Sequence, residues 1–378
     1  MSEVASPERL LFASTAQAFL EKEASLSRVR ELHAAGMSFD TDWWRRAAEL
    51  GWAGLLVPEE LGGGSVSGDG VADLALVAEQ IGKTVAPGPL HPVSTVLAGL
   101  VEAPENHENT IEALVSGELV ASWATYEMGQ PWAPFTPKVT ATATATGFRI
   151  NGVKDRVEAG ADSGVFLVVA RSEDGIRQFL VSADAAGVTV ELQPSIDMVK
   201  RYARVCFDDV EVDASAAVGT AEQTAALICR QSQIAQVLQC SEVVGILDTV
   251  MDFTVQWALD RYSFGRPLAS YQALKHRFAD MKIWLEACRA TTRAAVADVS
   301  ARTPGADMSV SVAKSYVGEH AAPMLQHCVQ LHGGIGVTWE HDLHLYLRRT
   351  TLYRAMFGTP EDHNLRVYAL TEELESAS

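Results

Sequence analysis

The sequence has little positive charge and no long uncharged apolar segment. Its 378 residues contain 30 Lys and Arg against 48 Asp and Glu, a formal net charge of −18. Nucleic-acid binding depends on basic patches that neutralise phosphates, so we expect no nucleic-acid partner. No run of about 18 uncharged apolar residues is present, so we expect no membrane span. The N-terminus also lacks the apolar stretch of a secretion signal, which favours a cytoplasmic protein.

Cysteine and histidine are present, but in no pattern typical of a metal site or a disulfide framework. The five cysteines are odd in number and scattered, with no CxxC pair. We therefore expect free thiols. The histidines show no HExxH or similar spacing. We expect no metal ion in this protein.

The hydrophobic periodicity changes twice along the chain. Residues 1–118 show apolar positions at helical spacing, interrupted by a glycine-rich loop. Residues 119–219 contain short alternating segments such as KVTATATATGFRING, which predict five or six strands with no room for helices between them. Residues 220–378 are helical again, beginning with a nearly unbroken stretch from Ala221 to Arg261. The predicted fold is α+β, with an N-terminal helical domain, a middle antiparallel β domain and a C-terminal helical bundle in these three ranges.

Three segments carry a resemblance to a known family. They are WWRRAAELGWAGLLVPEELGGG (43–64), DRYSFGRPLASYQALKHRFADM (260–281) and QLHGGIGVTWEHDLHLYLR (330–348). In this order and at these separations they resemble signature blocks of the acyl-CoA dehydrogenase family. The resemblance covers essentially the whole chain and implies the same helix–β–helix fold. The chain is also similar to actinobacterial members linked to sterol side-chain degradation.

The resemblance implies FAD as the cofactor, lying across a subunit interface. The C-terminal domain of one subunit then holds the ADP half of its neighbour's flavin. An arginine suits the pyrophosphate because its planar fork gives paired, charge-assisted hydrogen bonds, and glycines allow close backbone approach. The alternatives are a surface arginine at a helix end and a simple helix stop at the glycines. The residues implied are Arg261, Phe264, Gln272, Gln330, Gly333 and Gly334.

The β domain departs from the family where the flavin ring is expected. Family members usually have a TEPGAGSD-like loop and a strand that ends in a K-x-WITN-like segment. Here these read TYEMGQPW (125–132) and KDRVEAG (154–160). Only Lys154 and Gly160 keep the frame of the second segment, and Arg156 stands in place of its tryptophan.

The catalytic base of the family is also displaced. The reaction expected is α,β-dehydrogenation of an acyl-CoA thioester, in which a carboxylate removes the α-proton. The two family positions for this carboxylate correspond to Phe357 and Ala235. Glu242 lies two helical turns beyond Ala235, in an apolar stretch where burial raises a carboxyl pKa. Glu242 is the candidate general base, and the alternative is a glutamate paired with a buried arginine or a subunit contact.

Three functions remain open from the sequence. The first is an FAD-dependent acyl-CoA dehydrogenase with Glu242 as base, acting on a steroid- or branched-chain acyl-CoA. The second is a half-site subunit of a heteromeric dehydrogenase that completes the FAD site of a partner. The third, less favoured, is other flavin chemistry on the same fold. The resemblance implies a homo- or heterotetramer, with an electron-transferring flavoprotein as acceptor.

Overall fold

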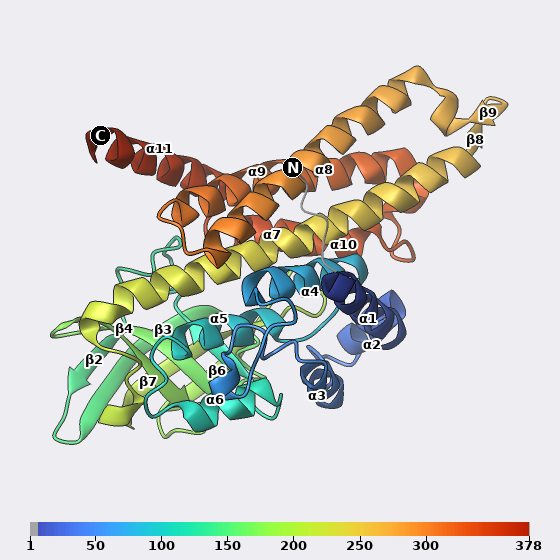
Figure 1. Cartoon of the computed structure of the whole chain (residues 1–378). Helices are drawn as coiled ribbons and strands as arrows, with labels where there is room; N and C mark the ends of the chain where they lie inside the picture. The colour runs from blue at the N-terminus through green and yellow to red at the C-terminus, as the bar shows by residue number, and fades with distance from the viewer. Residues whose placement is uncertain (1–6, 378) are drawn as a thin grey trace. The chain divides into compact units, whose positions relative to one another are not determined.

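The computed structural model describes residues 7–377, which fall into two compact units (Figure 1). The first unit comprises the residues up to Arg9 together with Arg30–Leu74 and Pro87–Ala235. The second comprises Leu10–Val29, Ala75–Ala86 and the chain from Gln236 onward. The order of helices and strands along the chain confirms the predicted fold class. The domain boundaries predicted near residues 118 and 219 stay a prediction.

Helices occupy the chain up to residue 115, as predicted. Asp40 accepts hydrogen bonds from the backbone N–H groups of Asp42 and Trp43, and Asp69 accepts one from Ala72. Both aspartates therefore act as N-caps of their helices. The helices are α1 (Pro7–Glu23), α2 (Leu26–Ala34), α3 (Thr41–Glu49), α4 (Gly70–Thr84), α5 (Leu90–Leu100) and α6 (Glu108–Val115), with a 3₁₀ turn η1 (Glu59–Leu61).

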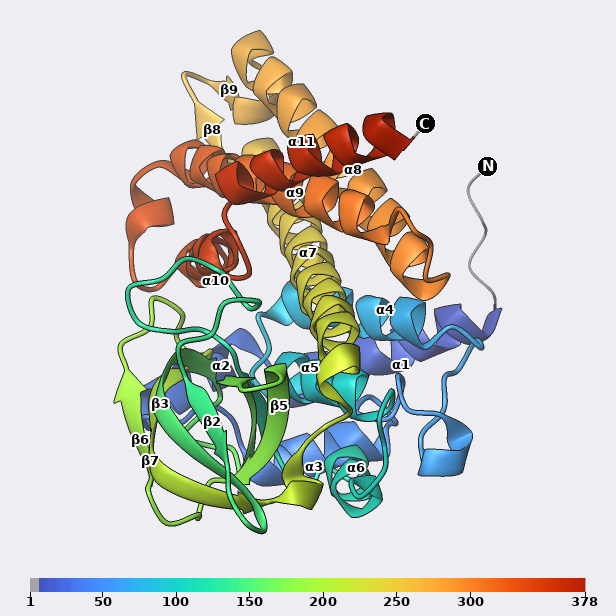
Figure 2. The ribbon, with the colours of Figure 1, turned by 90° about the vertical axis from the view of Figure 1, so that its left-hand side faces the viewer.

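A seven-stranded sheet follows within the first unit (Figure 2). The strands pair in the order β1-β4-β2-β3-β7-β6, and β5 pairs with β4. Most pairs are antiparallel, but β1 and β2 both lie parallel to β4, which corrects the prediction of a purely antiparallel sheet. The chain between β1 and β4 is long enough for the crossover that parallel pairing requires. The strands are β1 (Ala121–Ala124), β2 (Thr140–Ala143), β3 (Gly147–Glu158), β4 (Val165–Ser172), β5 (Gly175–Ser182), β6 (Val188–Gln193) and β7 (Tyr202–Asp213).

One face of this sheet closes over an apolar core. Phe166, Phe179 and Phe207 are its largest side chains, and each is at most 2% exposed. In β2, Ala141 is buried and the next residue, Thr142, is exposed, and in β3 Ile150 is buried next to exposed Arg149. The period-two pattern of the sequence thus matches the burial at these positions, whereas Ala143 at the end of β2 is exposed.

The second unit is helical. The long helix α7 (Ala221–Asp260) begins in the first unit and is the unbroken helix that the sequence predicts. Helix α9 packs against α8, α10 and α11. Helix α11 lies within the region that the sequence predicts to be helical, and Pro360 in its first turn is a usual helix start. After α7 come β8 (Tyr262–Ser263), β9 (Arg266–Pro267), η3 (Leu268–Ser270), α8 (Gln272–Ser300), α9 (Ala306–His332), η4 (Gly333–Val337), α10 (Leu343–Ala355) and α11 (Pro360–Ala377).

Helices α4 and α7 approach each other closely through two glycines of the second unit. A Cβ atom on Gly82 would lie 2.0 Å from the carbonyl oxygen of Glu242. A Cβ atom on Gly245 would lie 1.9 Å from the carbonyl oxygen of Glu79. Neither position tolerates a side chain, because such contacts are far inside van der Waals distance. The segment of α7 that carries Glu242 is therefore held directly against the backbone of α4.

Helix α7 is also the one helix in residues 7–377 that is long and apolar enough to cross a membrane. Within its most apolar window, 89% of the residues are buried inside the chain. Buried core helices of water-soluble proteins have this same composition, so the feature is weak evidence for a membrane span.

Candidate functional site

Glu242 lies in the interior of the second unit and is fully paired. The guanidinium of Arg349 donates a hydrogen bond to one carboxylate oxygen, and neither side chain is exposed. The hydroxyl of Tyr353 donates to the other oxygen at 2.7 Å. Arg349 also reaches the backbone carbonyl of Val85. The carboxylate is thus bonded through both oxygens to groups of helix α10.

This geometry corresponds to the alternative in which Glu242 is satisfied by a buried arginine. A general base needs hydrogen-bond reach to the proton that it abstracts. With 0% exposure, Glu242 has no surface on which a substrate proton can meet it in this conformation. Its role as a base stays a prediction.

The other family position for the base carries no carboxylate. Phe357 takes a left-handed backbone conformation, with φ of 58°, at the end of α10. The ring of His363 donates a hydrogen bond from Nε2 to the carbonyl oxygen of Phe357 at 2.9 Å. Burial, together with the nearby charge of Lys314, lowers the pKa of His363 to about 4, so this histidine is neutral near pH 7. The nearby acids Glu361 and Asp362 are bonded to Arg354 and Thr359.

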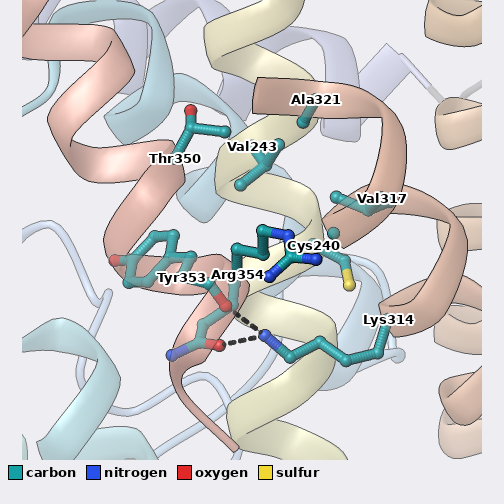
Figure 3. A pocket seen from close by; sticks show the side chains of 10 residues that line it. Cys240, Val243, Lys314, Val317, Ala321, Thr350, Tyr353 and Arg354 are labelled. Carbon is teal, nitrogen blue, oxygen red and sulfur yellow. Dashed lines mark hydrogen bonds between the residues drawn. The ribbon is translucent and has the colours of Figure 1, made fainter. Parts of the chain in front are cut away.

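A small cavity lies between α7, α9 and α10, close to these residues (Figure 3). At its base the ammonium of Lys314 donates to Gln239 Oε1 at 2.8 Å and to the carbonyl oxygen of Tyr353 at 2.6 Å. Burial lowers the pKa of Lys314 to about 8. The cavity volume is about 10 Å³. That is room for about one water molecule, far below the several hundred Å³ typical of ligand pockets, so this cavity is not an acyl-chain pocket.

The six residues implied for the ADP half of a flavin all lie on the surface of the second unit. They occupy the residue after α7, the β8–β9 hairpin, the start of α8, the last turn of α9 and the turn that follows it (Figure 1). Their positions are Arg261, Phe264, Gln272, Gln330, Gly333 and Gly334, and every one of them is exposed.

Trp257 connects two of these elements. Its indole ring stacks on the ring of His332 at 5.2 Å, and its Nε1 donates to the carbonyl oxygen of Leu331 at 3.2 Å. The guanidinium of Arg261 lies 5.9 Å from the centre of the same indole. Because His332 directly precedes Gly333, the tryptophan lies close both to Arg261 and to the glycine turn.

The backbone at the glycine turn and at the hairpin tip takes left-handed conformations, and the glycine turn leaves room for a ligand to approach. Gly333 has φ of 66°, and a Cβ atom on Gly333 or Gly334 would meet nothing within 4 Å. The space in front of the turn is therefore open. Phe264 is 96% exposed at the hairpin tip, with φ of 50°. An exposed aromatic side chain of this kind is typical of a surface that another molecule covers.

Polar groups complete this surface. The side chains of Gln272 and Gln330 are exposed, and neither forms a hydrogen bond within the described part of the chain. Gln272 is also the first residue of α8, whose preceding residue Tyr271 provides no side-chain cap. The free backbone N–H groups of such a helix start favour a phosphate. The donors, the open turn and the arginine all fit the diphosphate and ribose of FAD.

The segments expected at the flavin ring lie in the first unit and are bonded to each other. The guanidinium of Arg156 lies 4.4 Å from the centre of the Tyr126 ring and donates to the carbonyl oxygen of Gln130 at 2.9 Å. The ring of Trp132 packs on Tyr126 at 5.0 Å. Arg156 thus ties the two altered segments together with its own side chain. These residues do not match a surface that is kept open for a flavin ring.

A buried ion pair also stabilises the segment 125–132. Glu127 accepts hydrogen bonds from the ammonium of Lys154 at 2.8 Å and from the backbone N–H groups of Lys138 and Val139. Burial acts against the charge of Glu127, but Lys154 and the two N–H groups outweigh it and lower the pKa of Glu127. Lys154 therefore has a structural role as the partner of Glu127, although the residues after it differ from the family's K-x-WITN-like segment.

Trp257, Lys314 and Arg349 were not singled out from the sequence. Lys314 is the only charged residue between Asp307 and Glu319, whereas Arg349 lies beside Arg348 in a helix of mixed composition. Residues of this kind are rarely buried without a partner, and that was the available signal. Which partner each would meet was not encoded locally, because Arg349 is 107 positions from Glu242.

Two family models match the sequence. They are described as the acyl-CoA dehydrogenase N-terminal domain, over residues 6–118, and the acyl-CoA dehydrogenase C-terminal domain, over residues 229–369. A curated relative, the acyl-CoA dehydrogenase IpdE2 of Mycolicibacterium smegmatis, is 30% identical over 365 residues. This alignment covers 96% of the present chain and 99% of the relative.

Solved structures show the same similarity. The ChsE4–ChsE5 complex from Mycobacterium tuberculosis is 25% identical with a TM-score of 0.89, covering 99% of each chain. A variant of the steroid ACAD Tcur3481–Tcur3483 is 26% identical with a TM-score of 0.88, covering 98% of this chain and 99% of that one.

Proposed function

Because the chain belongs to the acyl-CoA dehydrogenase family, we propose that it is the flavin-completing subunit of a heteromeric acyl-CoA dehydrogenase. Family membership makes it an oxidoreductase that acts on CH–CH groups, and the cofactor is FAD. When bound, FAD supplies the redox chemistry by accepting a hydride from the β-carbon of the acyl-CoA thioester. In the proposed assembly the partner subunit supplies the base that takes the α-proton.

The observation that carries this proposal is the state of the carboxylate at position 242. Glu242 is enclosed by Arg349 and Tyr353, and Phe357 stands where the family has its other base. The chain thus offers no accessible carboxylate at either family position. Its contribution is to bind and orient, through Arg261, Phe264 and the turn at Gly333.

An asymmetry between the two halves of the flavin site supports the same proposal. The surface that would serve a neighbour's flavin keeps its arginine, its glutamines and an open glycine turn. The segments that would serve the chain's own flavin ring are joined by Arg156 instead. Two of the similar solved structures carry two-protein names, ChsE4–ChsE5 and Tcur3481–Tcur3483. A mixed tetramer is the assembly that we propose here.

The substrate of the proposed assembly is a steroid- or branched-chain acyl-CoA. Support comes from the similar structure described as a steroid ACAD. We further propose an electron-transferring flavoprotein as the electron acceptor and a cytoplasmic location.

The test is to purify the chain alone and record its visible spectrum and its mass in solution. We expect little or no flavin, and flavin bound at a defined ratio after co-expression with a homologous partner. A yellow homotetramer with close to one flavin per chain would overturn the heteromer proposal.

A self-sufficient dehydrogenase with Glu242 as base is the second candidate. It is favoured by one observation, a carboxylate on the helix face that carries the family's alternative base position. Its test is Glu242→Gln in whichever assembly turns over an acyl-CoA. A loss of turnover by about 10²-fold or more at unchanged flavin content would support this candidate. Turnover within a few-fold of wild type would exclude Glu242 as the base.

A further inference from the structure

Arg266, on strand β9 of the β8–β9 hairpin, lies over an aromatic ring, as does Arg261, which directly precedes β8. Its guanidinium lies 3.8 Å from the centre of the Tyr271 ring, a close stacked contact. The hydroxyl of Tyr271 donates to the carbonyl oxygen of Ser263 at 2.8 Å, and Ser263 is the cross-strand partner of Arg266. The tyrosine therefore fixes both the hairpin and the arginine that stacks on it.

Each of the two arginines contacts an aromatic ring and keeps the N–H donors of its guanidinium available. Arg261 and Arg266 are exposed, and neither guanidinium forms a hydrogen bond within residues 7–377. Stacking on an aromatic ring holds a guanidinium by its face, which leaves the five N–H groups at its edge available. Such donors are suited to the oxygens of a phosphate group, which accept paired hydrogen bonds.

The surrounding charge favours an anionic ligand. Residues 261–279 contain four Lys and Arg and no Asp or Glu, in a chain whose net charge is −18. The uncapped start of α8 follows Tyr271 directly and adds backbone N–H groups to the same surface. Leu268 donates its N–H to the carbonyl oxygen of Arg261 at 2.8 Å, which keeps the two strands of the hairpin together.

We propose that Arg266, held on the ring of Tyr271, is a second arginine contact to the diphosphate of the FAD that this surface receives. The inference rests on the proposed function, in which the hairpin serves the ADP half of a flavin. A diphosphate carries charge on both phosphate groups, so two separately oriented guanidinium groups match it better than one. Tyr271 is then a positioning residue that acts through Arg266.

The experiment measures FAD affinity and the salt dependence of flavin retention in the flavin-bearing assembly of the full chain. Arg266→Gln is expected to weaken FAD binding by about tenfold or more, as expected for a lost charge-assisted hydrogen bond. Flavin should also be released at a lower NaCl concentration. Tyr271→Leu should reproduce this loss because it removes the stacking surface, whereas Tyr271→Phe should remain near wild type.

Arg293→Gln is the matched control, since Arg293 is an exposed arginine on α8, about 30 Å along that helix from its start at Gln272. It should leave FAD affinity unchanged, and all variants should keep the melting temperature of wild type. Wild-type affinity in Arg266→Gln would overturn the proposed contact.

Arg261→Gln separates this inference from the function on which it rests. If Arg261→Gln loses flavin while Arg266→Gln does not, the ADP surface is correct and the second contact is wrong. If neither substitution affects FAD binding, the proposed ADP surface fails as well.

Discussion

Glu242 on α7 and Arg349 on α10 form an ion pair in which neither side chain is exposed. A buried pair of this kind contributes little net stability, because the desolvation of two charges offsets their attraction. Replacing one of the two charged side chains is costly, because the charge that remains is buried without its counter-ion. The ion pair therefore couples the contributions of α7 and α10 to the stability of the folded chain.

This dependence can be measured by substituting one partner at a time. We predict that Arg349→Met lowers the free energy of unfolding by about 3–5 kcal/mol, because Glu242 stays buried without its counter-ion and keeps only the neutral hydroxyl of Tyr353 among the partners described above. The double variant Glu242→Leu with Arg349→Met should recover much of that loss. Urea unfolding of wild type, the single variants Arg349→Met and Glu242→Leu and the double variant forms a double-mutant cycle. Additive losses in the double variant would contradict the pairing.

The close contact between α4 and α7 gives a prediction of another kind. We predict that Gly245→Ala destabilises the protein by about 1–3 kcal/mol or more, because its Cβ would overlap the carbonyl oxygen of Glu79. Gly305→Ala is the matched control, since a Cβ there meets nothing closer than 4.0 Å and its φ of −86° suits any residue. Thermal unfolding of both variants checks the difference, and equal melting temperatures would contradict it.

The pattern of the sequence was sufficient for the helices and strands but not for their partners. The apolar periodicity from Ala221 to Arg261 predicts α7 correctly, because a long buried helix imposes that pattern over many turns. Helix α11 falls within the predicted helical region, but its bounds were not predicted, since its mixed and largely exposed sequence has no clear apolar face. The parallel pairing of β1 with β4 was missed because tertiary packing decides which strands become neighbours.

The candidate site shows the same division. Burial of Glu242 follows from its apolar neighbours in the sequence. Its pairing with Arg349 and Tyr353 depends on how α10 packs on α7, which no local pattern reports. The roles of Trp257 and Tyr271 as stacking surfaces for arginines were invisible for the same reason.

His363 makes stability depend on pH in the acidic range. Its pKa is lowered from 6.5 to about 4, chiefly by burial. Between these values the unfolded chain binds a proton that the folded chain does not, so stability falls as pH is lowered from about 6.5 to about 4. The loss is roughly 3 kcal/mol at most for this one group.

We predict that His363→Asn removes this part of the pH dependence. Urea unfolding of wild type and variant between pH 4.5 and 7 isolates the contribution, since other acid-titrating groups are common to both proteins. The difference in unfolding free energy between wild type and variant should shrink or reverse toward the acidic end. A constant difference across this range would show that His363 does not titrate as expected.

Lys314 gives a pH dependence of the same sign in the alkaline range. Burial lowers its pKa from 10.5 to about 8, so the folded chain releases this proton before the unfolded chain does. Between about pH 8 and 10.5 the unfolded state binds more protons, and the contribution of Lys314 to stability rises with pH by up to roughly 3 kcal/mol. We predict that Lys314→Met, which keeps the side-chain length but cannot titrate, lacks this rise. The stability of wild type relative to the variant should increase from pH 7.5 to 9.5 in urea unfolding, because only wild type carries the ammonium that deprotonates earlier in the folded chain. A flat difference would mean that the ammonium stays charged in the interior, held by Gln239 and the carbonyl of Tyr353.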